Sequence, residues 1–124
     1  MLISLLILLV ALQIKHFVLD FAYQPPYMWM NKGTLGHPGG IIHAGLHALM
    51  SFILVLTVSS VSVALTVLLF EFVAHYLIDY AKMNINRIKG WKCNTHSEFW
   101  ILAGLDQLLH QFTYIIILMI VANN

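Results

Sequence analysis

Acidic residues and histidines recur four positions apart inside the apolar segments of this chain. Of the 5 acidic residues, all except Glu98 lie in such segments. In chain order, the sets are His16 with Asp20, His43 with His47, Glu71 with His75 and Asp79, and Asp106 with His110. Side chains four residues apart on a helix share one face, with Cβ atoms about 6 Å apart. Because an ionisable group at the bilayer centre costs about 2.5–3.5 kcal/mol on insertion scales, it marks a functional site by default.

The composition is that of an integral membrane protein. Of the 124 residues, 60% are hydrophobic and only 9% are charged, and the mean hydropathy is +0.86. Soluble domains contain about 25% charged residues. The formal net charge of +1 also argues against nucleic acid as a partner, since nothing would attract a polyanion.

We predict an all-α fold, a four-helix transmembrane bundle in which residues 1–124 form a single domain. A helical span needs about 20 apolar residues. The predicted spans cover residues 2–23, 41–59, 61–80 and 96–122. The first apolar segment lacks the basic region and cleavage site of a signal peptide, so we expect it to be retained.

Local signals mark where the spans begin and end. Pro25 and Pro26 forbid continuation of the first helix. Thr95 and Glu98 have the spacing of a capping box, which predicts that the fourth helix begins near His96. The third helix is expected to extend beyond the membrane and to break around Gly90.

The basic residues predict the topology. The loop after the third span contains a cluster of four, and the loop after the first contains Lys32, whereas the remaining connection and both termini contain none. By the positive-inside rule, both longer loops face the cytoplasm and both termini face the other side. The four are Lys82, Arg87, Lys89 and Lys92.

At this orientation all the polar pairs fall in the cytoplasmic half of the membrane, which predicts a shared site. Imidazoles and carboxylates are ligands of zinc, iron and manganese, and helix bundles build two-metal sites from such pairs. We therefore expect two or more transition-metal ions, most simply zinc. The predicted ligands are His16, Asp20, His43, His47, His75, Asp79, Asp106 and His110.

Two further residues are candidates for catalysis. Glu71 lies one turn from His75 and is expected to act as general base or as an additional ligand. Lys15 is the only fixed positive charge within a span, and it is expected to pair with Asp20 or to hold a phosphate, a role also open to Lys82.

Several functions fit this pattern. The preferred one is a membrane-embedded, metal-dependent hydrolase acting from the cytoplasmic side on a phosphoester of a lipid or lipid-linked substrate. A metal-ion or proton-coupled carrier, functioning as a homo-oligomer, is the first alternative. Its polar groups should continue into the outer half, which is almost wholly apolar. The second is a non-enzymatic phage membrane protein for superinfection exclusion or lysis, whose polar pairs fix helix packing.

Five strings carry a resemblance to a known family: HFVLDFAYQ from His16, Asn31-Lys32, His43, HYLIDYAK from His75 and DQLLH from Asp106. Together they resemble an uncharacterised family, a domain of unknown function, of small multi-pass bacterial and phage membrane proteins. The resemblance implies a bacterial inner-membrane location and no assigned activity.

More loosely, the chain is similar to inner-membrane metal-dependent hydrolases of the SOS-induced type. Through them it resembles the zinc phospholipase C and P1 nuclease group, whose multi-zinc sites use similar pairs. The chain is shorter than those enzymes, lacks their N-terminal Trp ligand and has a His-x-x-x-His pair.

Overall fold

The structure, a computed structural model that describes residues 1–124, is entirely helical and contains no strand. This confirms the predicted fold class. Four helices are long and apolar enough to cross a membrane: Leu2–Ala22, Pro38–Leu56, Val61–Lys89 and Ser97–Ala122. The elements are α1 (Leu2–Phe17), a π-helical turn η1 (Val18–Ala22), the short α2 (Pro26–Trp29), α3 (Pro38–Leu56), α4 (Val61–Lys89) and α5 (Ser97–Ala122).

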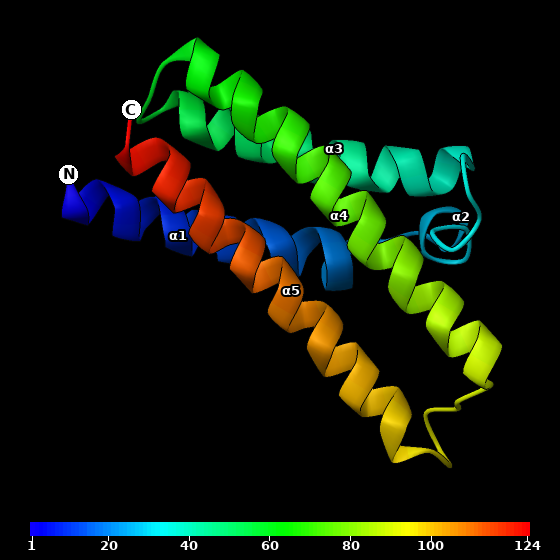
Figure 1. Ribbon diagram of the computed structural model, residues 1–124. Helices are drawn as coiled ribbons and strands as arrows, with labels where there is room; N and C mark the ends of the chain where they lie inside the picture. Colours follow the sequence, from blue (N-terminus) through cyan, green and yellow to red (C-terminus); the bar gives the residue numbers. More distant parts are fainter.

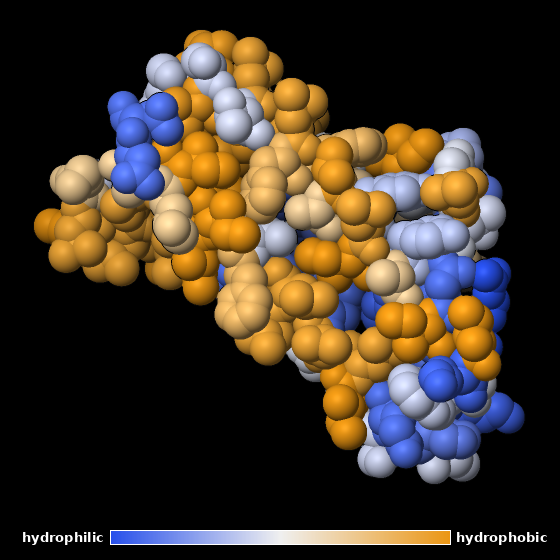
Figure 2. Space-filling model, viewed as in Figure 1, coloured by the Kyte–Doolittle hydropathy of each residue, from blue (hydrophilic) through white to orange (hydrophobic).

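The helices form a bundle with two different ends. Both termini and the tight α3–α4 turn lie at one end, whereas α2 and the α4–α5 loop lie at the other (Figure 1). Apolar side chains cover most of the face shown in Figure 2, and hydrophilic ones gather around the α4–α5 loop, with a smaller group at the C-terminal end of the chain. An apolar exterior on helices of this length is what a lipid environment requires.

The first span does not end as a regular α-helix. Its last residues, Val18–Ala22, form a π-helical turn, in which Tyr23 N donates to Val18 O at 2.6 Å. Pro25 and Pro26 follow at once and prevent the α-helix from continuing. This wide turn contains Asp20, and single π turns of this kind often occur at functional sites.

Helix α3 begins at Pro38, earlier than the predicted residue 41, and ends at Leu56. Proline is well suited to the first helical position, where its missing N–H costs nothing. The preceding His37 caps the helix, because its Nδ1 accepts a hydrogen bond from Gly39 N at 3.0 Å.

Helix α4 ends where expected, and α5 begins where expected but without the predicted cap. Helix α4 continues to Lys89 and ends at Gly90, whose φ of 68° is left-handed, as expected for a helix-ending glycine. The capping box predicted for α5 is wrong. Its N-cap is His96, which makes no side-chain capping bond. Thr95 Oγ1 contacts His96 Nδ1 at 2.8 Å instead, so its oxygen does not cap the helix.

Candidate metal centre

All eight predicted ligands meet at one level of the bundle. Each long helix supplies one of the i, i+4 pairs, so the helical spacing turns each pair towards the common centre. None of the eight side chains is more than 6% exposed. The pairs are His16 and Asp20 from α1 and η1, His43 and His47 from α3, His75 and Asp79 from α4, and Asp106 and His110 from α5.

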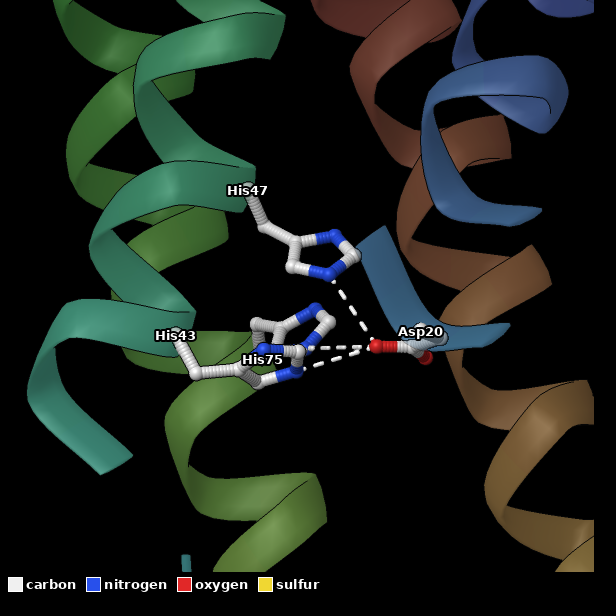
Figure 3. A group of neighbouring side chains, drawn as sticks. All are labelled: Asp20, His43, His47 and His75. Atoms are coloured by element: carbon white, nitrogen blue, oxygen red, sulfur yellow. Dashed lines mark hydrogen bonds and ion pairs between the residues drawn. The ribbon is translucent and has the colours of Figure 1, made fainter. Parts of the chain in front are cut away.

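Three imidazoles and one carboxylate surround a single point (Figure 3). Asp20 Oδ1 lies 3.0 Å from His43 Nε2, 3.1 Å from His47 Nε2 and 3.9 Å from His75 Nε2. His43 Nε2 and His75 Nε2 are 3.1 Å apart. In a tetrahedral zinc site with bonds of about 2.0–2.1 Å, neighbouring ligand atoms are roughly 3.3–3.4 Å apart. Three of these four separations are slightly shorter than that value and one is longer, so the donor atoms lie close enough together to hold one ion.

Asp79 extends this group towards α5. Its Oδ2 lies 3.3 Å from His43 Nε2 and 3.4 Å from His75 Nε2, while its Oδ1 lies 3.5 Å from His110 Nε2. His110 Nε2 is in turn 3.6 Å from Asp106 Oδ1. Asp79 thus faces two neighbouring sets of donors, one with each oxygen, which is the position of a carboxylate that bridges two ions.

His16 completes the second set. Its Nε2 lies 3.3 Å from Asp20 Oδ2, the carboxylate oxygen that faces away from His43 and His47. Tyr114 OH contacts His16 Nδ1 at 2.8 Å and orients the ring, as polar partners of metal-binding imidazoles do. Gln107 Oε1 lies 2.8 Å from His16 Nε2.

Several buried atoms in the cluster have no hydrogen-bond partner. Among them are Asp79 Oδ2, Asp106 Oδ1 and both ring nitrogens of His110. A network built only for hydrogen bonding would satisfy its members, because a buried polar atom without a partner costs about 1–3 kcal/mol. Of these atoms, Asp106 Oδ1 and His110 Nε2 fit the donor set of a second ion, and Asp79 Oδ2 faces the first set of donors.

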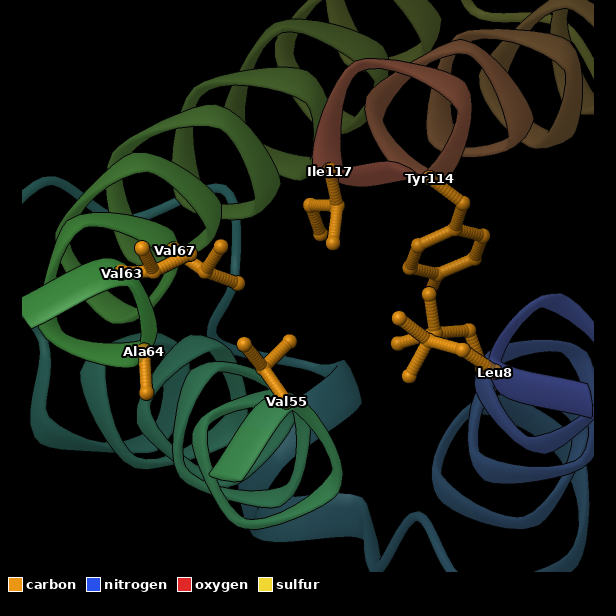
Figure 4. Packing of buried hydrophobic residues seen from close by; sticks show 8 residues of the cluster. Leu8, Val55, Val63, Ala64, Val67, Tyr114 and Ile117 are labelled. Atoms are coloured by element: carbon orange, nitrogen blue, oxygen red, sulfur yellow. The ribbon is translucent and has the colours of Figure 1, made fainter. Parts of the chain in front are cut away.

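The two residues predicted to act in catalysis contact each other, and Lys15 reaches the cluster only through the backbone of His47. Lys15 and Glu71 form a fully buried ion pair, and Lys15 Nζ also donates to Ser51 Oγ at 3.0 Å and to His47 O at 3.3 Å. The expected partner of Lys15, Asp20, is not its contact. The pair lies between the cluster and the apolar core, in which Leu8, Val55, Val67 and Ile117 face one another with Tyr114 (Figure 4). Glu71 Oε2 has no partner.

Lys32 is a member of the centre that sequence reasoning missed. Although it belongs to the loop between α2 and α3, it is 8% exposed, and its Nζ lies 3.0 Å from Asp79 Oδ2. The angles make this a charge contact rather than an aligned hydrogen bond, since Asp79 Oδ2 has no hydrogen-bond partner. Nothing in the local sequence indicates how far a loop lysine reaches. Tyr114 was also missed, but it continues the four-residue spacing of Asp106 and His110.

The remaining candidates lie outside the centre. Lys82 lines a pocket of about 70 Å³ between α4 and α5, where Asp106 also lies, but it makes no ion pair. His37 and His96 occupy helix caps. Cys93 is exposed and free.

The comparisons with known proteins give a family and no activity. Residues 8–124, nearly the whole chain, match the family described as a protein of unknown function, DUF3307. No curated protein matches the chain, and no solved structure matches it. The match includes every residue of the candidate metal centre, and the chain belongs to the DUF3307 family.

Proposed function

We propose that this protein is a membrane-embedded, metal-dependent hydrolase that acts on a phosphoester of a lipid or lipid-linked substrate. Two or more transition-metal ions, most simply zinc, would occupy the centre. The observation that carries the proposal is the spacing of four ligand atoms, from Asp20, His43, His47 and His75, all within 4.8 Å of one another. Zinc favours this donor set in a tetrahedral arrangement.

The charge of the centre supports the same conclusion. Asp20, Asp79 and Asp106 contribute three negative charges, and Lys32 contributes one positive charge. The pair formed by Lys15 and Glu71 is neutral in sum. With neutral imidazoles, a net charge of −2 is buried among helices, and such a charge must be compensated. One divalent cation neutralises it.

The donor atoms divide between two ions. His43, His47 and His75 with Asp20 Oδ1 would hold the first, while Asp79 Oδ1, Asp106, His110 and His16 offer donors for a second. A pair of such ions supplies a Lewis acid for a phosphoryl oxygen and activates water near neutral pH. Tyr114 holds the ring of His16, and Lys15 fixes the His47 backbone through its carbonyl oxygen.

Glu71 remains our candidate for a general base, through its unpartnered Oε2, and Lys15 for the group that sets its position.

We also propose a bacterial inner-membrane location with the centre open to the cytoplasm and both termini periplasmic, as the basic loops indicate. The lipid of that membrane would then surround the protein and also supply its substrate. A carrier is less well supported, because the half of the bundle nearer the termini is filled by the packed core of Leu8, Leu12, Val55, Val67 and Ile117. A homo-oligomer would be needed to provide a path.

Elemental analysis of detergent-purified protein tests the proposal. We expect about one to three zinc ions per chain, and release of phosphate or of a phosphorylated headgroup from an added lipid phosphoester. His75→Gln should lower both, whereas His96→Gln, which alters an exposed histidine outside the cluster, should lower neither. Folded wild-type protein that takes up no transition metal would overturn the proposal. If the protein binds metal but hydrolyses no lipid phosphoester, the metal site would stand and the proposed hydrolase activity would be wrong.

A further inference from the structure

We infer that Lys32 is the anion-binding residue of the centre and that the substrate it selects carries a phosphate group. This inference rests on the proposed function and deepens it. Of the lysines, only Lys32 makes an ion pair with a residue of the ligand cluster, through its contact with Asp79. Lys15 is held in its own ion pair with Glu71, and Lys82 makes none.

The loop that carries Lys32 is held firmly in place. Gly36 N donates to Tyr76 OH at 2.8 Å, and Asn84 Nδ2 donates to Gly33 O at 2.9 Å. Both bonds attach the loop to α4, the helix that provides Asp79. The ammonium group therefore reaches the centre from a loop whose residues directly after Lys32 are attached to α4, so little ordering is required when an anion binds.

Two glycines allow the loop to lie directly against the start of α3. A Cβ on Gly40 would lie 3.2 Å from Lys32 Cα, and a Cβ on Gly39 would lie 2.2 Å from Tyr27 O. The backbone of Lys32 thus packs against the first turn of the helix that supplies His43. A side chain at Gly39 would collide with the backbone of α2, and one at Gly40 would press on the backbone at Lys32.

The charge balance defines the ligand class. With neutral imidazoles the centre carries −2 with Lys32 included, and two divalent ions would bring it to +2, which complements a phosphate dianion. Ions held by Asp79 would replace Lys32 as the counter-charge of this carboxylate, and the lysine would then be available to donate to a phosphate oxygen. Lysine is a common phosphate-binding residue, acting as a point charge.

A pocket near Lys32 could accommodate the part of the ligand attached to the phosphate. A pocket of about 190 Å³ lies beside the loop, one to two turns beyond Asp79 along α4. Its lining includes Gly33 and Thr34, which follow Lys32, and Arg87 from α4. The pocket ends at the residues next to Lys32 and presents Arg87 and polar side chains, so it offers an anionic headgroup a place beside the loop.

Binding of phosphate to the zinc-loaded protein tests the inference. Each protein is titrated in detergent with inorganic phosphate and, separately, with a short-chain phosphatidate. The proteins are wild type, Lys32→Met, Lys82→Met as the alternative lysine and Lys89→Met as the surface control. Zinc content is measured on the same samples. Because hydrogen bonds to charged groups contribute about 1.5–3 kcal/mol, Lys32→Met should weaken phosphate binding at least about tenfold. The other two variants should bind as wild type does. Phosphatidate binding much tighter than phosphate would identify a lipid headgroup as the source, and equal binding would identify the free anion.

The zinc measurement separates a binding role from a structural one. Loss of Lys32 makes the centre more negative, so Lys32→Met should keep or gain zinc. If Lys32→Met lost zinc, the lysine would be a structural counter-charge and the inference would be wrong. Zinc-loaded Lys32→Met that binds phosphate like wild type, or zinc-loaded wild type that binds none, would also overturn it. Wild-type protein without zinc would instead refute the proposed function.

Discussion

Replacement of Lys15 by methionine should destabilise the bundle by about 3–5 kcal/mol, because it leaves the Glu71 carboxylate buried without a partner. The two side chains are 2% and 1% exposed, so water cannot replace the lost contact. Unit charges about 4 Å apart attract each other by roughly 4 kcal/mol at an effective dielectric constant of about 20. Lys15 Nζ also donates to Ser51 Oγ and His47 O, and those bonds are lost as well.

The double variant Lys15→Met/Glu71→Gln separates the pair from the surrounding packing. Once both charges are gone, only a neutral amide remains buried, at a cost of about 1–3 kcal/mol. The double variant should therefore be much less destabilised than the sum of the two single variants, with a coupling energy of about 2 kcal/mol or more. Thermal or denaturant unfolding in detergent measures all the variants. Lys89→Met, at an exposed position, is the control and should stay within about 0.5 kcal/mol of wild type.

Additive single and double variants would refute the ion-pair reasoning. The same variants test the catalytic role of Glu71. If Glu71 is the general base, Glu71→Gln should keep its zinc and lose turnover. If Glu71→Gln also loses zinc, Glu71 is a ligand and the assignment as base is wrong.

Three further predictions follow from the centre and the basic loops. Chelation should lower the melting temperature on the order of 10 °C, because an ion at about 1,000 times its Kd stabilises the folded state by about 4 kcal/mol; a melting temperature insensitive to chelator and to added zinc would contradict a metal centre. Asp79→Asn should lower zinc content while membrane expression persists, whereas Glu98→Gln at an exposed acid should not; equal zinc in both variants would exclude Asp79 as a ligand. A reporter fused after Asn124 should read as periplasmic and one inserted near Lys89 as cytoplasmic, and the opposite pattern would reverse the predicted topology.

The sequence predicted that the ligand side chains would lie at one level of the bundle, because a helix has a fixed rise and rotation per residue. A four-residue spacing places His75 and Asp79 on one face wherever the helix lies, and an apolar flank fixes their depth in a membrane. The level of the centre therefore needed no knowledge of tertiary contacts. The helix boundaries were less predictable, as the start of α3 at Pro38 and the failed capping box at Thr95 show.

The partners within the centre depend on long-range contacts that local periodicity does not contain. Lys15 pairs with Glu71, 56 residues away, rather than with the nearby Asp20. Lys32 reaches Asp79 from a loop whose backbone packs closely against Gly40 at the start of α3. These contacts depend on the rotation of each helix and on the path of one loop, and neither is encoded in a repeat.

The unequal lengths of the helices have a consequence for the surrounding lipid. Helix α3 has 19 residues and is about 28 Å long, whereas α4 has 29 residues and is about 44 Å long. A bilayer core of about 30 Å matches the first and is too thin for the second, which must tilt or protrude. In Figure 1, α4 and α5 run beyond the level at which α1 ends. The bilayer surface should therefore dip on the α1 and α3 side, and the candidate centre would lie close to the headgroups there. A lipid could then present its phosphate without leaving the membrane, and membrane thickness would become a determinant of activity.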